Sequence, residues 1–168
     1  MFTLVVGGAS SGKSEYAESL LPNGGIYIAT MRPYGDESLE RIARHRAMRA
    51  RKGFSTAECY TDLGELDIPA GSDALLECIG NLTANELFGG AGESTAGAVV
   101  NGVLRLSDIC RRLVVVSNDV SSGGSGYGVE TVNYMRTIGE INLRLARAAD
   151  SVCEVVCGMA IYYKGAER

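Results

Sequence analysis

The sequence predicts an α/β fold in which a mostly parallel sheet is covered by helices on both faces. Short apolar runs alternate along the chain with segments of helical spacing, as expected for a repeated strand-helix unit. The apolar runs are continuous rather than interrupted by polar residues, which is typical of parallel strands buried on both faces. A chain of 168 residues can also bury a full core, so we expect a single domain over residues 1–168.

Each predicted element corresponds to one such run or segment. Strands are expected at residues 2–6, 26–30, 74–79, 113–118 and 152–157. Helical spacing predicts helices over residues 14–21, 36–52, 81–88, 99–112 and 130–150. After the fifth strand, Gly158 and Met159 precede a further apolar run, which predicts a hairpin and an antiparallel strand at the edge of the sheet, residues 160–164.

Two glycine-rich segments, residues 89–97 and 121–128, interrupt this pattern. The second directly follows the strand predicted at residues 113–118, at the end of the sheet where open α/β folds bind their ligands. It is therefore either a mobile loop over a binding site or simply a solvated loop.

The composition argues against several classes of protein. A formal net charge of −4 argues against a general nucleic-acid surface. No apolar run approaches the roughly 18 residues that a membrane span needs, and the amino terminus lacks the basic start and cleavage site of a secretion signal. Five cysteines without a C-x-x-C pair, and a single histidine, argue against a disulfide framework or a zinc site. These features predict a protein of the reducing cytoplasm with no nucleic-acid partner and no membrane span.

Residues 7–14, GGASSGKS, match the phosphate-binding motif G-x-x-x-x-G-K-[ST] between a predicted strand and a predicted helix. Glycines allow successive backbone N–H groups to turn toward phosphates, and the start of the helix adds its positive dipole end. The lysine supplies a charge to the β- and γ-phosphate oxygens. The motif predicts a nucleoside triphosphate site formed by Gly7, Gly8, Ala9, Ser10, Ser11, Gly12, Lys13 and Ser14.

This site predicts a bound Mg²⁺ as well. The Ser14 hydroxyl is the expected first ligand, and an acidic second ligand should follow a neighbouring strand. Glu77 and Asp119 are the candidates. We favour Glu77, because a carboxylate within so apolar a run must be paired or bound to a metal, whereas Asp119 lies in a polar loop.

The single histidine lies in a strongly basic segment. Six of the 16 basic residues are gathered here: Arg41, Arg44, Arg46, Arg49, Arg51 and Lys52. On a helix, Arg41, His45 and Arg49 share one face, where the two guanidinium groups could hold a polyphosphate. These cations would also keep the imidazole neutral, with a ring nitrogen able to attack phosphorus. The alternative is a solvated basic helix that carries a surface histidine.

These residues and several further motifs resemble the family of bifunctional adenosylcobinamide kinase/adenosylcobinamide-phosphate guanylyltransferases of cobalamin biosynthesis. The likeness covers most of the chain, and RIARHR followed by TAEC and LLEC is more specific than the phosphate-binding motif. It implies a P-loop NTPase with a RecA-like fold that assembles as a homotrimer. Such an enzyme phosphorylates the aminopropanol hydroxyl of the corrinoid adenosylcobinamide with GTP or ATP, takes GMP from GTP onto His45 with release of pyrophosphate, and passes it to adenosylcobinamide phosphate. Besides the motif, the resemblance implies nucleotide contacts at Thr30, Arg49, Glu58 and Glu77.

The chain departs from the family pattern at three points, and two other functions stay open. Ser10 replaces an arginine, Ala50 replaces a proline, and Asp119 replaces a glutamate ahead of extra glycines. One alternative is a P-loop small-molecule kinase in which His45 is idle. The other is a nucleotide-dependent regulatory binding module, although the sequence lacks the N-K-x-D motif of switch GTPases.

Overall fold

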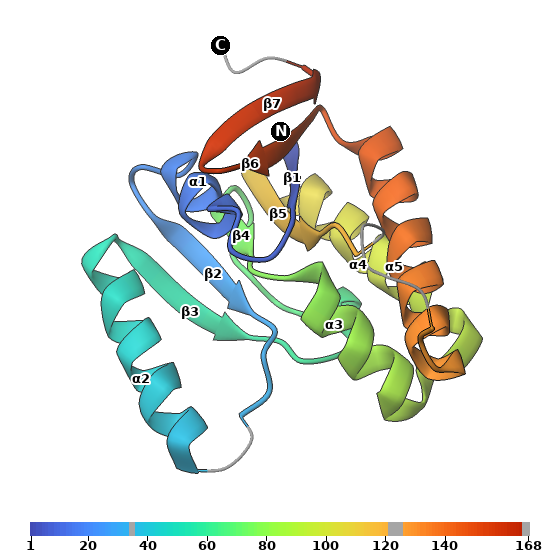
Figure 1. Ribbon diagram of the computed structural model, residues 1–168. Coiled ribbons are helices and arrows are strands. Elements are labelled where there is room, and N and C mark those ends of the chain that lie inside the picture. Colours follow the sequence, from blue (N-terminus) through green and yellow to red (C-terminus); the bar gives the residue numbers. More distant parts are fainter. Residues whose placement is uncertain (34–35, 121–125, 166–168) are drawn as a thin grey trace.

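The computed structural model describes residues 1–33, 36–120 and 126–165, and within these ranges a seven-stranded sheet forms the centre of the molecule (Figure 1). The strands lie in the order β3-β2-β4-β5-β1-β6-β7. All neighbouring strands are parallel except β6 and β7, which form an antiparallel hairpin. Their bounds are β1 (Phe2–Gly7), β2 (Gly25–Ala29), β3 (Phe54–Glu58), β4 (Asp73–Leu76), β5 (Arg112–Asn118), β6 (Ser151–Val156) and β7 (Met159–Lys164).

Helices cover both faces of the sheet (Figure 1). On one face lie α1 (Lys13–Ser19) and α2 (Asp36–Arg51), and on the other α3 (Ile79–Glu86), α4 (Thr95–Ile109) and α5 (Val129–Ala148). Three short helical turns, η1 (Leu63–Glu65), η2 (Leu87–Ala91) and η3 (Gly92–Ser94), complete the helical segments of the described chain. Within the described ranges, no helix combines the length and the apolar character that a bilayer crossing requires.

Consecutive strand residues enter two separate cores. Leu4 and Val5 of β1 point to opposite faces and are both fully buried, as are Leu75 and Leu76 of β4. The larger core lies under α3, α4 and α5, and the smaller one under α1. Both faces of the central strands are covered, and their middle residues, 4–6, 74–76 and 113–116, are all apolar, as the continuous apolar runs predicted.

The structure confirms the predicted α/β class and the carboxyl-terminal hairpin, and it corrects several element boundaries. The strand expected at residues 74–79 ends at Leu76, because Cys78 caps α3: its sulfur accepts a hydrogen bond from the N–H of Asn81. The glycine-rich segment 89–97 contains helical turns and the start of α4. Strand β3 was not predicted. The hypothesis of a mobile loop over residues 121–128 falls mostly on residues 121–125, outside the described residues.

The carboxyl ends of the parallel strands gather at one edge of the sheet. Gly7 at the end of β1 lies opposite Asn118 at the end of β5, and Ala29 of β2 lies opposite Glu58 of β3. The segments that carry the predicted site residues leave the sheet from this edge, so residues distant in sequence are brought close together.

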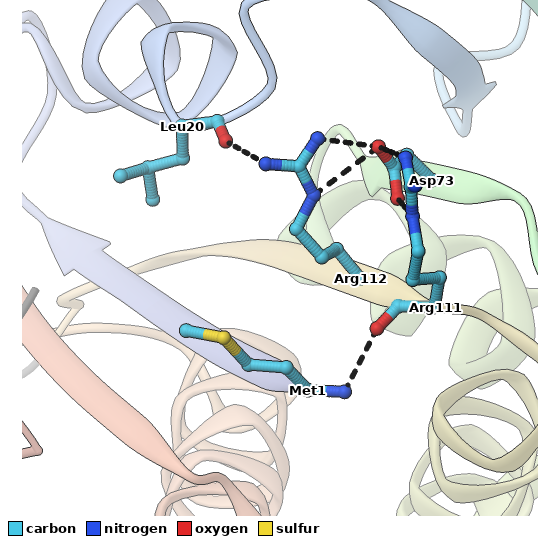
Figure 2. A network of polar contacts seen from close by, with 5 residues as sticks. All are labelled: Met1, Leu20, Asp73, Arg111 and Arg112. Carbon is cyan, nitrogen blue, oxygen red and sulfur yellow. Dashed lines mark hydrogen bonds and ion pairs between the residues drawn. The ribbon is translucent and has the colours of Figure 1, made fainter. Parts of the chain in front are cut away.

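An ion-pair network closes the opposite, amino-terminal edge (Figure 2). Asp73, the first residue of β4, accepts hydrogen bonds from Arg111 Nε (2.9 Å) and Nη2 (2.7 Å) and from Arg112 Nε (3.1 Å). Arg112 also reaches the carbonyl oxygen of Leu20 after α1, and the amino group of Met1 donates to the carbonyl oxygen of Arg111. The network therefore ties the starts of β1, β4 and β5 to the end of α1.

Candidate active site

The predicted phosphate-binding motif forms a glycine-rich loop, residues 7–14, between β1 and α1. Ser10 and Gly12 have left-handed backbones, with φ of 56° and 89°. The carbonyl oxygen of Gly12 accepts a hydrogen bond from the N–H of Tyr16, which starts α1. Lys13 folds back over the loop, and its Nζ donates to the carbonyl oxygen of Gly8 at 3.0 Å. The lysine ammonium thus lies against the loop, where it could neutralise a bound phosphate.

Packing inside the loop explains why glycine is needed at position 7. A Cβ atom on Gly7 would lie 2.6 Å from Ser11 Oγ and 2.8 Å from the carbonyl oxygen of Val155 in β6. At Gly8, by contrast, a Cβ would meet open space. The buried Ser11 hydroxyl has no hydrogen-bond partner in the described structure. The loop is therefore packed tightly on its sheet side and open on its outer side, an arrangement that fits a bound polyphosphate.

Glu77 lies at the same edge, directly after β4, and contacts α2. Its N–H donates to the carbonyl oxygen of Ile28, which fixes the backbone beside β2. Its carboxylate pairs with Arg49, with 3.4 Å between Oε2 and Nη2. The Arg49 guanidinium is buried and stacks on Tyr27, with Cζ 3.7 Å from the ring centroid. Burial and the nearby Glu77 carboxylate raise the pKa of Tyr27, so this phenol stays neutral.

A cavity of about 430 Å³ connects these residues to the loop. Its lining includes Ser14 and Glu18 from α1, Tyr27 from β2, Arg49 from α2, Lys52 directly after α2, and Glu77. Lys52 forms an ion pair with Glu18 across the space between the two helices. Ser14 and Glu77, the two residues predicted to bind Mg²⁺, both line this cavity.

Asp119, the alternative acidic candidate, lines a different cavity. Its N–H donates to the carbonyl oxygen of Gly7 at 3.2 Å, so its backbone lies beside the loop. The cavity that it lines, of about 480 Å³, lies against α5 on the other face of the sheet. Ser14 and Asp119 therefore line cavities on opposite faces of the sheet.

Thr30 and Glu58 follow β2 and end β3, respectively. Thr30 is fully buried, and its hydroxyl donates to the carbonyl oxygen of Cys78 at 3.0 Å. Its own carbonyl oxygen accepts from Nδ2 of Asn85 in α3. Glu58 forms an ion pair with Arg46 of α2. Thr30 thus joins β2 to α3, and Glu58 joins β3 to α2.

The backbones of Arg41 and His45 belong to α2, but their side chains lie outside the described part of the structure. His45 precedes Arg49 by about one helical turn, so the helix that carries the histidine borders the cavity through Arg49. The predicted shared face of Arg41, His45 and Arg49 stays a prediction.

Asn118 and Cys78 lie between the loop and Glu77, and neither was predicted as a site residue. Asn118 Nδ2 donates to Cys78 Sγ at 3.7 Å, and its carbonyl oxygen accepts from Asn142 Nδ2. Burial raises the pKa of the Cys78 thiol, which keeps it protonated. The sequence could have indicated both residues, because each lies at the end of an apolar run, and these runs end at the carboxyl edge of the sheet.

The acidic and sulfur-containing side chains do not form a metal site by themselves. Among the described residues, no group of three or more His, Cys, Asp or Glu side chains could hold a metal ion. Mg²⁺ usually takes one or two protein ligands and completes its shell with water and phosphate oxygens. Ser14 and Glu77 fit that requirement, because the two residues carry a hydroxyl and a carboxylate and line one cavity.

Comparison with known proteins gives matches over nearly the whole chain. The sequence model of the family described as cobinamide kinase / cobinamide phosphate guanyltransferase matches residues 3–162. A protein of Salmonella typhimurium, the bifunctional adenosylcobalamin biosynthesis protein CobU, is 34% identical over an alignment that covers 98% of this chain and 100% of the relative. The Escherichia coli protein of the same name is 32% identical with the same coverage. The Pseudomonas aeruginosa protein CobP is 29% identical and covers 98% of both chains.

Proposed function

The chain belongs to the cobinamide kinase / cobinamide phosphate guanyltransferase family, and we propose that it performs both transfers at the carboxyl edge of its sheet. It is a bifunctional kinase and nucleotidyltransferase of adenosylcobalamin biosynthesis. Its substrates are nucleotides and cobinamide. The observation that carries the proposal for the site is the single cavity lined by Ser14 of the glycine-rich loop, Arg49 of the histidine-bearing helix, and Glu77.

The glycine-rich loop is proposed to hold the nucleoside triphosphate in both reactions, as in other P-loop NTPases of RecA-like fold. Support comes from the open outer side of Gly8 and from the position of Lys13 over the loop. In the kinase step, the aminopropanol hydroxyl oxygen of adenosylcobinamide attacks the γ-phosphorus. The bond from that phosphorus to the bridging oxygen breaks, the hydroxyl proton is released, and the nucleoside diphosphate leaves. Lys13 stabilises the charge on the phosphate oxygens throughout.

Mg²⁺ is proposed to bind between Ser14 and Glu77. When bound, it supplies positive charge to the β- and γ-phosphate oxygens. In the described structure the Arg49 guanidinium contacts Glu77 at 3.4 Å. A cation bound by Glu77 would weaken this pair, and the guanidinium could then bind phosphate oxygens instead, which is the role that the resemblance implies for Arg49.

His45 is proposed to carry the guanylyl group. A neutral ring nitrogen attacks the α-phosphorus of GTP, a phosphorus-nitrogen bond forms, and pyrophosphate leaves. A phosphate oxygen of adenosylcobinamide phosphate then attacks the same phosphorus. The phosphorus-nitrogen bond breaks, and adenosylcobinamide-GDP leaves. Arg41 and Arg49 would neutralise the leaving pyrophosphate, and the basic segment 41–52 supports this assignment.

Further expectations concern the assembly and the compartment. The resemblance implies a homotrimer, which light scattering on the purified protein would test. The reducing cytoplasm stays the compartment expected from the sequence, whose five cysteines include no C-x-x-C pair.

The decisive experiment uses GTP labelled at the α-phosphate. His45 is the only histidine in the chain, so a guanylyl group on an imidazole, which is acid-labile and base-stable, can lie at one position only. The His45→Ala variant distinguishes it from a lysine phosphoramidate, which has the same stability. We expect label on the native enzyme and at least about a thousandfold less on His45→Ala. The same variant should still transfer the γ-phosphate to cobinamide, because the kinase step does not use the imidazole.

Each other outcome points to a different function. Label that persists on His45→Ala would contradict the assignment of the nucleophile. Transfer of the γ-phosphate with no label on the native protein would indicate a kinase alone. No turnover of any corrinoid, together with nucleotide-dependent capture of a protein partner, would indicate a regulatory binding module.

A further inference from the structure

We infer that the β6–β7 hairpin positions the glycine-rich loop for nucleotide binding, and that Gly158 and Tyr162 are the positioning residues. The inference rests on the proposed function, because it concerns the framework of the same nucleotide site. The hairpin lies at the other end of the chain from residues 7–14, yet it contacts both the loop and α1.

The first contact joins the hairpin turn to the middle of the loop. The N–H of Gly158 donates to the carbonyl oxygen of Ser11 at 2.8 Å. Gly158 also packs against Gly12, where an added Cβ would lie 3.1 Å from Gly158 Cα. Gly12 has a φ of 89° and is the residue from which α1 begins. The turn therefore supports the loop at Ser11 and Gly12, directly before Lys13.

The turn itself has a fixed shape. Cys157 and Gly158 both have left-handed backbones, with φ of 51° and 79°, between the paired residues Val156 and Met159. Two left-handed central residues define a type I′ turn, the form that matches the twist of a two-stranded hairpin. A turn of this kind has little freedom to move relative to its strands. The hydrogen bond from the N–H of Gly158 to Ser11 therefore fixes the position of the loop relative to the hairpin.

The second contact joins β7 to α1. The hydroxyl groups of Tyr162 and Tyr16 are 2.7 Å apart and form a hydrogen bond. Tyr16 lies three residues after Lys13, so it is close to one helical turn beyond it. The hairpin thus holds the backbone at Ser11 and the side chain at Tyr16, on either side of Lys13 and Ser14.

This arrangement predicts an effect on binding rather than on chemistry. A loop that is less firmly held populates its binding-competent shape less, and the apparent dissociation constant rises by the same factor. Because the loop binds phosphates and not the base, ATP, GTP and inorganic tripolyphosphate should be affected alike. The turnover number at saturating nucleotide and the KM for cobinamide should stay near their native values.

The first test compares two glycines in matched surroundings. Gly158 and Gly71 have φ of 79° and 78°, an added Cβ at either would meet open space, and each N–H donates to a backbone carbonyl at 2.8 Å. Gly71 lies before β4, at the amino-terminal edge. Alanine at either position introduces the same backbone strain and should lower the melting temperature similarly. We expect Gly158→Ala to raise the dissociation constants about tenfold, and Gly71→Ala to leave them unchanged.

The second test compares two tyrosines of the same strand. Tyr162→Phe removes the bond to Tyr16, whereas Tyr163→Phe removes a bond to Glu154 on the other face. Tyr162→Phe should raise the three dissociation constants about three- to fivefold, the value of one net hydrogen bond, and Tyr163→Phe should not. The effects of Tyr16→Phe and Tyr162→Phe should combine to less than their sum, because both variants remove the bond that the two hydroxyl groups share.

Calorimetric titration of the full chain separates the possible outcomes. If Gly158→Ala binds nucleotide no more weakly than Gly71→Ala, or Tyr162→Phe no more weakly than Tyr163→Phe, the inference is wrong while the proposed function stands. Failure of the native protein to bind any of the three ligands would overturn the proposed function, and the inference with it.

Discussion

Strand β4 carries one carboxylate at each end, and the two have different surroundings. Asp73 is the first residue of the strand, and Glu77 follows its last residue. The Asp73 side chain is 5% exposed and receives hydrogen bonds from two guanidinium groups at distances down to 2.5 Å (Figure 2). The Glu77 side chain is 18% exposed and contacts Arg49 at 3.4 Å.

The difference separates a structural carboxylate from one suited to binding. The two arginines of Asp73 come from β5 and the residue before it, so the pairs fasten two strands together where they begin. A new ligand at Asp73 would have to displace short, charge-assisted hydrogen bonds. The longer contact of Glu77 is weaker, and its partner lies on a helix that borders a cavity. A cation can therefore replace Arg49 at Glu77 far more easily than it can replace the arginines at Asp73.

Replacing each carboxylate by its amide tests this comparison, and Glu77→Gln should have the largest effect. Loss of the proposed Mg²⁺ ligand should lower the rates of both transfers about a thousandfold, or about 4 kcal/mol in the barrier. Stability should change by at most about 1 kcal/mol, because the amide oxygen can still accept from Arg49. Steady-state rates at varied Mg²⁺, with urea unfolding alongside, measure the two effects. Full activity of this variant would contradict the role of Glu77.

Asp73→Asn should show the reverse pattern. The amide cannot accept from both guanidinium groups, and its NH₂ group would face cationic donors. We expect the free energy of unfolding to fall by about 2–3 kcal/mol. This is less than the loss expected for a fully buried ion pair, because the side chains of both arginines are partly exposed to solvent. Activity per folded molecule should stay native. A selective loss of turnover without destabilisation would mean that the amino-terminal edge takes part in the chemistry.

The sequence predicted the features that depend on neighbouring residues. The continuous apolar runs indicated buried strands, and the structure confirms them, because the two cores use alternate residues of each run. The glycine-rich loop was predicted between a strand and a helix, and Gly158 was predicted in a hairpin; both lie as expected. In each case a few adjacent residues determine the local backbone.

Features that depend on distant residues could not be predicted. Strand β3 was missed because, of its five residues, only Phe54 is buried, so the segment lacks an apolar run. The stacking of Arg49 on Tyr27 joins residues from α2 and β2, which are far apart in the sequence. The basic residues around Arg49 in the sequence indicated only a solvated helix face or a phosphate site. The same holds for the contact between Gly158 and Ser11, which joins the two ends of the chain.

The smallest predicted effect is an acid-dependent loss of stability at Asp73. Hydrogen bonds from Arg111 and Arg112 lower the pKa of this carboxyl well below its usual range. A lowered folded-state pKa stabilises the protein above the unfolded-state pKa of about 3.9, and this stabilisation is lost as the pH falls from there toward the folded-state pKa. The unfolding free energy of the native protein should therefore fall by about 1 kcal/mol more than that of Asp73→Asn between pH 5 and pH 3. Urea unfolding of both proteins at these pH values measures the difference. Parallel losses in the two proteins would mean that Asp73 contributes nothing to the acid sensitivity and that the contrast between the ends of β4 does not extend to their electrostatics.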